Sequence, residues 1–316
     1  MTKINGLGFI NHYRNGDCFI NKQYVRQLIN KIDAHHVYYV HDNHESVTAD
    51  LPVIKMNLPE LPMKFPQTFT VAYDTRYSHL FINTWVGSAV PKHFNWGEHP
   101  NFVKLHAIWK DIFKEVEQVI PDLTLDGDYR DNLPVIDFSK YNLEKANAWI
   151  DSHAEKNFVI ICNGKQLSDQ SSMGDMKNII FNLSKKYDHI NFLICDKLDV
   201  NRENVFYTDD IFGDSIGNLP QISYLSHHAK LIVGKNSGPF SFAHTYSNNM
   251  NSNQTFICFS KIMEHCLAGD GEYYAEHLFS DTTDDEIATN IISKSIEKIG
   301  ENRKTEFKKI MHVYPD

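Results

Sequence analysis

Apolar residues occur along the chain in short runs that alternate with stretches of helical spacing. Near the N-terminus, residues 4–13 (INGLGFINHY) form an apolar run of strand length, which ends at a polar Asn-Gly-Asp turn. In residues 20–32 an apolar side chain then recurs every four positions, as on one face of a helix. This order predicts an α/β fold that opens with a strand, a turn and a helix.

The rest of the first half continues the pattern. Residues 37–40 and 53–56 predict two further strands. Residues 68–73 and 79–85 are rich in β-branched and aromatic side chains and predict a β pair. A long helix is expected from about Asn101 to Ile120, because helical spacing persists up to a proline.

The second half restarts the alternation after a polar segment, Asp122 to Pro134, which is the strongest linker candidate. Predicted strands and helices then alternate: strands at 158–162, 190–195, 205–207, 231–233 and 256–259, and helices at 176–187, 219–229 and about 284–310. We therefore expect two Rossmann-like, doubly wound domains, residues 1–133 and 134–283. Residues 284–316 would form a C-terminal helix, whose return to the first domain is left open.

Composition and charge narrow the class of protein. The 316 residues are 42% hydrophobic and 22% charged, as in globular proteins. The net charge of −9 argues against a nucleic-acid binder, which usually carries a basic face. No apolar run is long enough for a transmembrane segment or a signal peptide. Five scattered cysteines without C-x-x-C fit reduced thiols in the cytoplasm, and peripheral contact with a membrane stays open.

Two strand-to-helix turns carry polar residues suited to chemistry, because sheets of this class bind ligands at the carboxyl ends of strands. Gly16-Asp17 follows the first strand, and Asp17 either caps the next helix or accepts a proton from a substrate hydroxyl. Asn163-Gly164-Lys165 follows residues 158–162. There Gly164 would let the backbone approach a phosphate and Lys165 would add charge, although an ordinary turn with an exposed lysine is the simpler interpretation.

A third turn is the most informative. The strand at 231–233 runs into Gly234-Lys235-Asn236-Ser237-Gly238-Pro239, and a helix opens near Phe240. Ser237 Oγ and the N–H groups around Gly238 suit a diphosphate, and a purely structural turn explains the pattern equally well. No G-x-G-x-x-G follows the first strand of either domain, which disfavours an NAD enzyme.

Residues 218–243 (NLPQISYLSHHAKLIVGKNSGPFSFA) resemble the C-terminal motif of the ADP-heptose:lipopolysaccharide heptosyltransferases. In that family a helix beginning with Leu-Pro leads to a strand and then to Val-Gly-x-Asp-Ser/Thr-Gly-x-x-His. Gly16-Asp17 and the helix after it resemble the opening of the same family. Asn236 and Ser241 stand where the family has Asp and His.

The resemblance implies a GT-B fold, in which two Rossmann-like domains face a cleft. It implies inverting, metal-independent sugar transfer from a nucleotide-diphosphate sugar to a hydroxyl acceptor, such as a glycan or lipid-linked glycan, without a cofactor. The first domain would bind the acceptor, with Asp17 as general base. The second domain would bind the nucleotide-sugar through Asn163, Gly164, Lys165, Asn236, Ser237, Gly238 and Pro239.

Other interpretations remain. A non-catalytic nucleotide- or glycan-binding protein of the same fold is the main alternative, and a sugar-nucleotide 2-epimerase is a third. Asp126-Gly127-Asp128 imitates a metal-binding Asp-x-Asp, but it lies in the predicted linker and fits a solvated turn. The histidines show no spacing typical of a metal site. Arg76 and Asn83-Thr84-Trp85 are candidate acceptor contacts.

Overall fold

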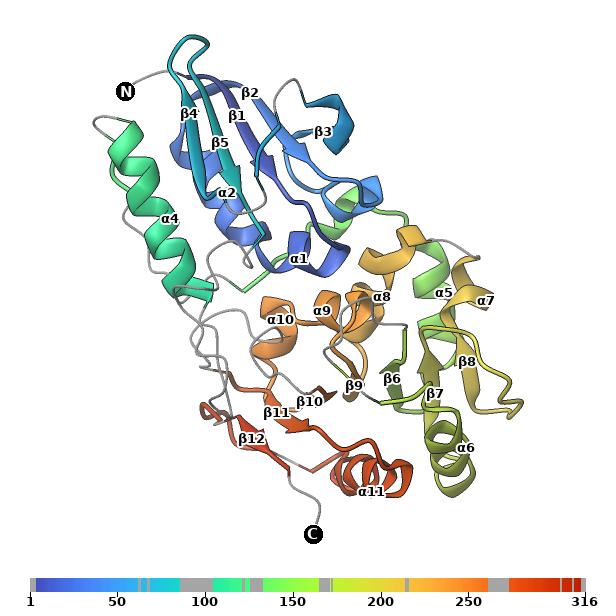
Figure 1. Ribbon diagram of the computed structural model, residues 1–316. Helices are drawn as coiled ribbons and strands as arrows, with labels where there is room; N and C mark the ends of the chain where they lie inside the picture. Colours follow the sequence, from blue (N-terminus) through green and yellow to red (C-terminus); the bar gives the residue numbers. More distant parts are fainter. Residues whose placement is uncertain are drawn as a thin grey trace. The chain divides into compact units, whose positions relative to one another are not determined.

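The computed structural model describes residues 4–61, 64–66, 69–85, 105–120, 123–125, 133–164, 171, 173–213, 216–260, 273–301, 303–308 and 310–313. The chain forms two compact units, one of residues 1–137 and one of residues 138–266 and 271–316 (Figure 1). Each unit is built on its own sheet. Most of the predicted linker, including Asp126-Gly127-Asp128, lies outside the described residues.

The first unit contains a five-stranded sheet in the order β3-β2-β1-β5-β4. Its strands are β1 (Ile4–Ile10), β2 (Ala34–Val40), β3 (Ile54–Met56), β4 (Val71–Asp74) and β5 (His79–Asn83). β1 pairs in parallel with both β2 and β5. β4 pairs with β5, as predicted, and the two strands are antiparallel. Because β2 and β5 lie on opposite sides of β1, the strand order reverses between β1 and β5.

Helices cover one face of this sheet: α1 (Asn15–Ile20), α2 (Lys22–Lys31) and α4 (Leu105–Val119), with the short turns η1 (Glu45–Val47) and η2 (Leu58–Glu60) elsewhere. Tyr24 of α2 stacks on Trp109 of α4 with ring centroids 4.8 Å apart, and both side chains are fully buried. The helix predicted over 20–32 is interrupted at Asn21, where one helix ends and the next begins.

The second unit contains a seven-stranded, wholly parallel sheet in the order β12-β11-β10-β9-β6-β7-β8. Its strands are β6 (Phe158–Cys162), β7 (Asn191–Ile194), β8 (Val205–Tyr207), β9 (Leu231–Lys235), β10 (Thr255–Phe259), β11 (Glu276–Ser280) and β12 (Met311–His312). β7 and β8 follow β6 on one side of the sheet, and β10, β11 and β12 follow β9 on the other side. The reversal between β6 and β9 is typical of dinucleotide-binding folds.

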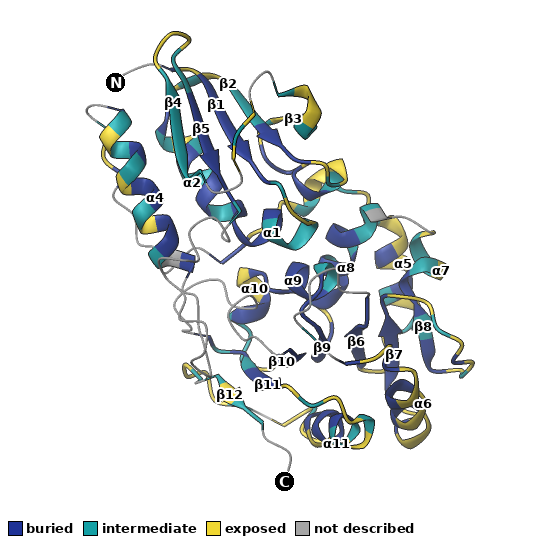
Figure 2. Cartoon of the chain, in the orientation of Figure 1, coloured by how far each residue is buried: buried dark blue, intermediate teal, exposed yellow. Residues whose placement is uncertain are grey.

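Helices lie on both faces of this second sheet, as predicted: α5 (Glu144–Ser152), α6 (Lys177–Lys186), α7 (Thr208–Phe212), α8 (Leu219–Ser226), α9 (Gly238–Ala243), α10 (Tyr246–Asn249) and α11 (Asp285–Ile296), with the turns η5 (Phe138–Lys140) and η6 (Ile216–Asn218). Apolar residues of α6 and α11 pack on Val159 and Ile161. Trp149 of α5 packs edge-on against Phe158, whose side chain points to the other face. Figure 2 shows β6 and β7 buried between these layers.

The C-terminal helix is shorter than predicted. α11 ends at Ile296 rather than near Ile310, and the chain turns at Gly300, whose φ of 94° a side chain rarely adopts. Beyond this turn β12 adds to the sheet beside β11, two strands that the sequence pattern did not reveal. None of the helices in the described ranges has the length and apolar character needed to cross a bilayer.

Two histidines lie in the interior of the second unit. His244 and His277 are 2% and 1% exposed, and both rings stack on Phe256. Their own ring centroids lie 5.4 Å apart, so the three rings form one cluster. His244 Nε2 and both ring nitrogens of His277 find no hydrogen-bond partner among the described residues. Burial therefore lowers the pKa of His244 to about 3 and that of His277 well below its usual value.

Acidification should destabilise this unit. Burial lowers the pKa of His244 below its value of 6.5 in the unfolded chain. The neutral histidine therefore contributes its full stability to the folded state above pH 6.5, and this contribution is lost as the pH falls below 6.5. Between pH 6.5 and 5, His244 should cost about 2 kcal/mol of unfolding free energy. Urea denaturation at both pH values should show a smaller loss in His244→Phe than in wild type. The exposed control His189→Gln should keep the wild-type loss, and an equal loss in all three proteins would contradict this interpretation.

Candidate functional site

At the carboxyl edge of the first sheet, Asn21 joins the segments that follow β1 and β5. Its amide nitrogen donates to the carbonyl oxygens of Asp17 (2.6 Å) and Thr84 (2.7 Å). Its amide oxygen accepts from Trp109 Nε1 at 2.7 Å. Asn11, just after β1, donates to Thr84 Oγ1 at 3.0 Å. These contacts place Asp17 beside the end of β5, at the reversal point where such sheets bind ligands.

Asp17 is not the N-cap residue of helix α1. The N-cap is Arg14, which makes no side-chain cap bond, and Asp17 lies in the first turn. Burial raises the pKa of the Asp17 carboxyl to about 6, against the opposing effect of the backbone N–H groups of Arg14 and Asp17. A carboxylate with this pKa is ionised at neutral pH, yet it is a stronger base than an exposed aspartate.

An aromatic pair lies at the same edge. Tyr13, which follows β1, stacks on Trp85, which follows β5, with ring centroids 4.0 Å apart and planes inclined by 15°. Asn11 Oδ1 and Asn83 Oδ1 each accept the backbone N–H two residues ahead, at 2.9 Å, and so fix the backbone of both aromatic residues. Tyr13 is 37% exposed, so part of its ring faces solvent.

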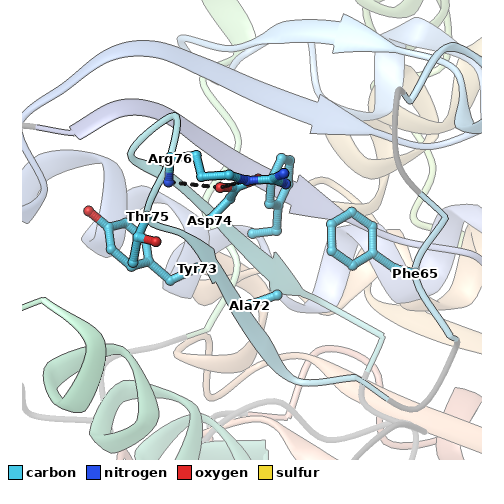
Figure 3. A pocket seen from close by; sticks show the side chains of 7 residues that line it. Phe65, Ala72, Tyr73, Asp74, Thr75 and Arg76 are labelled. Carbon is cyan, nitrogen blue, oxygen red and sulfur yellow. Dashed lines mark hydrogen bonds and ion pairs between the residues drawn. The ribbon is translucent and has the colours of Figure 1, made fainter.

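Arg76 lies away from this edge. It is in the turn between β4 and β5, at the amino end of β5, whereas Asp17 follows the carboxyl end of the parallel strand β1. Arg76 pairs with Asp74 at 3.0 Å in the wall of a pocket of about 290 Å³ (Figure 3). The other lining residues are Phe65, Ala72, Tyr73, Thr75 and Phe81. Topology thus separates Arg76 from the other candidate acceptor contacts.

The reversal point of the second sheet brings together the turns after β6 and β9. Cys162 is in register with Gly234, so Asn163 and Lys235 follow on neighbouring strands. The Asn163 side chain both donates to and accepts from the backbone of Asp196, at 2.9 Å each way, and ties β6 to the end of β7. Asn163 therefore positions this edge. Lys165 lies outside the described residues.

Ser237 is the N-cap of α9, but its side chain makes no cap bond. Its Oγ is buried and has no hydrogen-bond partner in the described part of the chain. The N–H groups of Gly238 and Phe240 lie in the first turn of α9, where no intrahelical acceptor is available, and Pro239 has no N–H. The turn thus offers a hydroxyl and backbone donors to a ligand.

The glycines of this turn have different roles. A Cβ on Gly234 would lie 2.7 Å from Cys162 Cβ and 2.9 Å from its carbonyl oxygen, so packing of β9 on β6 requires glycine. A Cβ on Gly238 would meet only Leu219, at 3.8 Å. Nothing in the described fold requires glycine at 238, which fits close approach of a ligand to the backbone.

Lys235 is a further polar residue at this edge, which sequence reasoning did not select as a binding residue. It ends β9, is 7% exposed, and its Nζ donates to the carbonyl oxygen of Gly174 at 3.3 Å. Burial lowers the pKa of Lys235, and the charges of Asp196 and Asp175 oppose that shift. The available signal was a lysine at the end of an otherwise apolar strand. Among the described residues, no group of three His, Cys, Asp or Glu side chains is arranged to hold a metal ion.

Comparisons with known proteins identify the fold. No protein-family profile and no curated sequence matches the chain. A family 9 glycosyl transferase from Veillonella parvula is similar in structure, with a TM-score of 0.52 and 9% identity over 96% of this chain and 93% of that one. The E. coli ADP-heptose lipopolysaccharide heptosyltransferase II has a TM-score of 0.51 and 9% identity, over 93% and 99%.

An E. coli heptosyltransferase solved with ADP also has a TM-score of 0.51 and 9% identity, over 93% of this chain and all of that one, 100%. At such identities the likeness shows the fold alone. It extends over nearly the whole chain and confirms the predicted α/β fold class of the GT-B type, and with it the remote resemblance to heptosyltransferases.

The close contact between β6 and β9 can be tested by adding one methyl group. Gly234→Ala should lower the unfolding free energy by about 1–3 kcal/mol, because the new Cβ overlaps Cys162 and the ring of Phe240. Gly174→Ala is the matched control, because no atom lies within 4 Å of its added Cβ, and it should change stability by less than about 0.5 kcal/mol. Urea denaturation measures both, and equal effects would contradict the packing role of Gly234.

Proposed function

We propose that this protein is a glycosyltransferase that moves a sugar from a nucleotide-diphosphate donor to a hydroxyl acceptor. One observation carries the proposal: the turn of Ser237 and Gly238 lies at the reversal between β6 and β9, and the buried Ser237 hydroxyl has no hydrogen-bond partner among the residues that the structure describes. Ligands of doubly wound sheets bind at such points. The fold shared with transferases, one of them solved with ADP, supports this choice.

In this proposal the second unit binds the donor. A diphosphate needs several oriented N–H and O–H donors where water is excluded. Ser237 Oγ, the N–H groups next to Gly238, and Lys165 would supply them, while Asn236 and Pro239 shape the turn. Gly164 would admit the phosphates, and Asn163 would hold the loop through Asp196 rather than bind the ligand itself.

The first unit would bind the acceptor, with Asp17 as general base. The Asp17 carboxylate takes the proton of the acceptor hydroxyl, and the acceptor oxygen bonds to the anomeric carbon as the bond from that carbon to the diphosphate oxygen breaks. The electron pair leaves with the diphosphate, and the configuration inverts. A pKa of about 6 suits this base, and the partly exposed Tyr13 would offer an aromatic surface to a sugar ring.

We propose that transfer needs no metal ion, because backbone donors and a lysine can offset the charge that develops on the leaving diphosphate. A glycan or lipid-linked glycan is the proposed acceptor. The cytoplasm is the proposed location, supported by Cys162 and Cys195, which remain free thiols although their Sγ atoms are 3.9 Å apart. A non-catalytic nucleotide binder is the second candidate, favoured by Asn236 and Ser241 where the resembled family has Asp and His.

Asp17→Asn tests the base. The amide keeps the shape of the side chain but cannot take a proton, so transfer should fall about hundredfold or more. Unfolding temperature and nucleotide affinity should not fall, since burial already disfavours the charge. In wild type, kcat/KM should decline as the pH drops through about 6, because protonation removes the base.

Asp33→Asn, which alters an exposed carboxylate just before β2, is the control and should transfer at the wild-type rate. A lower unfolding temperature with an unchanged rate in Asp17→Asn would show that the residue is structural. A strict requirement for added Mg²⁺ or Mn²⁺ would contradict metal-independent transfer.

Ser237→Leu tests the donor site. The larger side chain fills the turn, so affinity for ADP, UDP or GDP, whichever wild type binds, should fall at least about tenfold. Ser237→Ala removes only the hydroxyl and should cost about 2- to 10-fold, the value of one neutral hydrogen bond. Calorimetry measures both affinities, and circular dichroism checks folding. Unchanged nucleotide affinity in a folded Ser237→Leu variant would place the donor elsewhere.

A further inference from the structure

Lys235 is a buried cation with little to balance it. Only 7% of its surface is exposed, and its one hydrogen bond within the described residues is the 3.3 Å contact to the Gly174 carbonyl. An ammonium group has three N–H donors, and burying a charge without partners is costly. Asp196 and Asp175 affect its charge from a distance, but neither forms an ion pair with it.

Lys235 lies at the carboxyl edge of the second sheet, where the strand order reverses. β9 lies between β6 and β10, and Lys235 is its last residue, in register with Phe259 at the end of β10. Gly174 belongs to the connection between β6 and α6, which begins with Asn163 and Gly164. Lys235 Nζ therefore links the turn that follows β9 to the connection that follows β6. Lys235 also precedes Ser237 by two residues, and Ser237 Oγ has no hydrogen-bond partner in the described ranges.

We propose that Lys235 Nζ binds the diphosphate of the nucleotide donor, together with Ser237 Oγ from the same turn. This inference rests on the proposed function and adds a second positive charge to the one proposed for Lys165. An anionic ligand would replace the hydration that Lys235 loses on burial and complete its hydrogen bonds. The chain also has the neutral Asn236 where the resembled motif has a carboxylate, so the next residue does not neutralise the lysine.

A purely structural role would look different. If Lys235 served only to hold the β6–α6 connection through Gly174, its charge would be unnecessary, because a neutral amide donates the same bond. Substitutions can therefore test the charge of Lys235 and its hydrogen bond to Gly174 separately. Lys235→Gln keeps a donor for the Gly174 carbonyl and removes the charge, Lys235→Met removes both, and Lys235→Arg keeps the charge.

The control is Lys230→Met. Lys230 is exposed and directly precedes β9, so it lies at the other end of the same strand, about 17 Å from Lys235. Titration calorimetry would measure affinity for ADP, UDP and GDP, for inorganic pyrophosphate, and for the matching nucleosides. Thermal unfolding of every variant would report the structural role.

We expect Lys235→Gln and Lys235→Met to weaken nucleoside diphosphate and pyrophosphate binding about 10- to 100-fold, as for the loss of one charge-assisted hydrogen bond. Nucleoside affinity should stay within about twofold, because nucleosides lack the phosphates that Nζ would contact. Lys235→Arg should retain most of the affinity for diphosphates, and Lys230→Met should match wild type.

Unchanged diphosphate affinity in Lys235→Gln would overturn the inference. So would equal losses for nucleosides and diphosphates accompanied by a lower unfolding temperature, which would make Lys235 a loop anchor. If Lys235→Met does not fold, Lys235→Gln alone decides. Wild type that binds no diphosphate would refute the donor site and Lys235 together, whereas diphosphate binding through Lys235 without sugar transfer would refute only the proposed transferase.

Discussion

The close contact of Gly234 with Cys162 is the constraint on which the second unit depends. It holds β9 against β6 at the point where the strand order reverses, and a single added Cβ would lie 2.7 Å from its neighbour. The connection after one strand of a reversal runs to one side of the sheet, and the connection after the other strand runs to the opposite side. The edge between the two strands therefore stays available to a ligand. The packing of β9 on β6 consequently helps to hold the residues that follow, Lys235 to Gly238, at this edge.

In the first unit, hydrogen bonds of one side chain hold the segments at the reversal point. Asn21 interrupts the helix after β1 and uses its side chain to bind the carbonyl oxygens of Asp17 and Thr84. A buried amide that satisfies two carbonyls and one indole N–H leaves little freedom to the segments that it joins. The carboxylate of Asp17 and the stacked ring of Tyr13 are thereby brought to the same edge, where the raised pKa of Asp17 follows from its burial.

Two buried lysines differ in the groups that compensate their charge. Lys22 is fully buried in the first unit, and Asp50 pairs with both Lys22 and Arg26 while also accepting the backbone N–H of Asp137. That network is complete and joins α2 to the end of the unit. Lys235 has only a carbonyl oxygen within hydrogen-bond reach among the described residues. The two lysines differ in how their charges are compensated rather than in burial, and this difference supports the proposed ligand contact of Lys235.

The sequence by itself determined the alternation of strands and helices, the pairing of β4 with β5, and the three polar turns after β1, β6 and β9. Apolar periodicity and turn residues are local properties, so they can be read one segment at a time. The sequence pattern did not predict β11 or β12, and it predicted too late an end for α11. In this region pairing with a distant strand outweighs local preference. Only the tertiary structure showed that the Asn163 side chain binds the backbone of Asp196 and that Arg76 lies at the opposite edge from Asp17. It also showed that the Lys235 ammonium has only the Gly174 carbonyl oxygen as a hydrogen-bond partner within the described part of the chain. Those properties depend on strand order and on contacts between residues far apart in the chain, which no local pattern records.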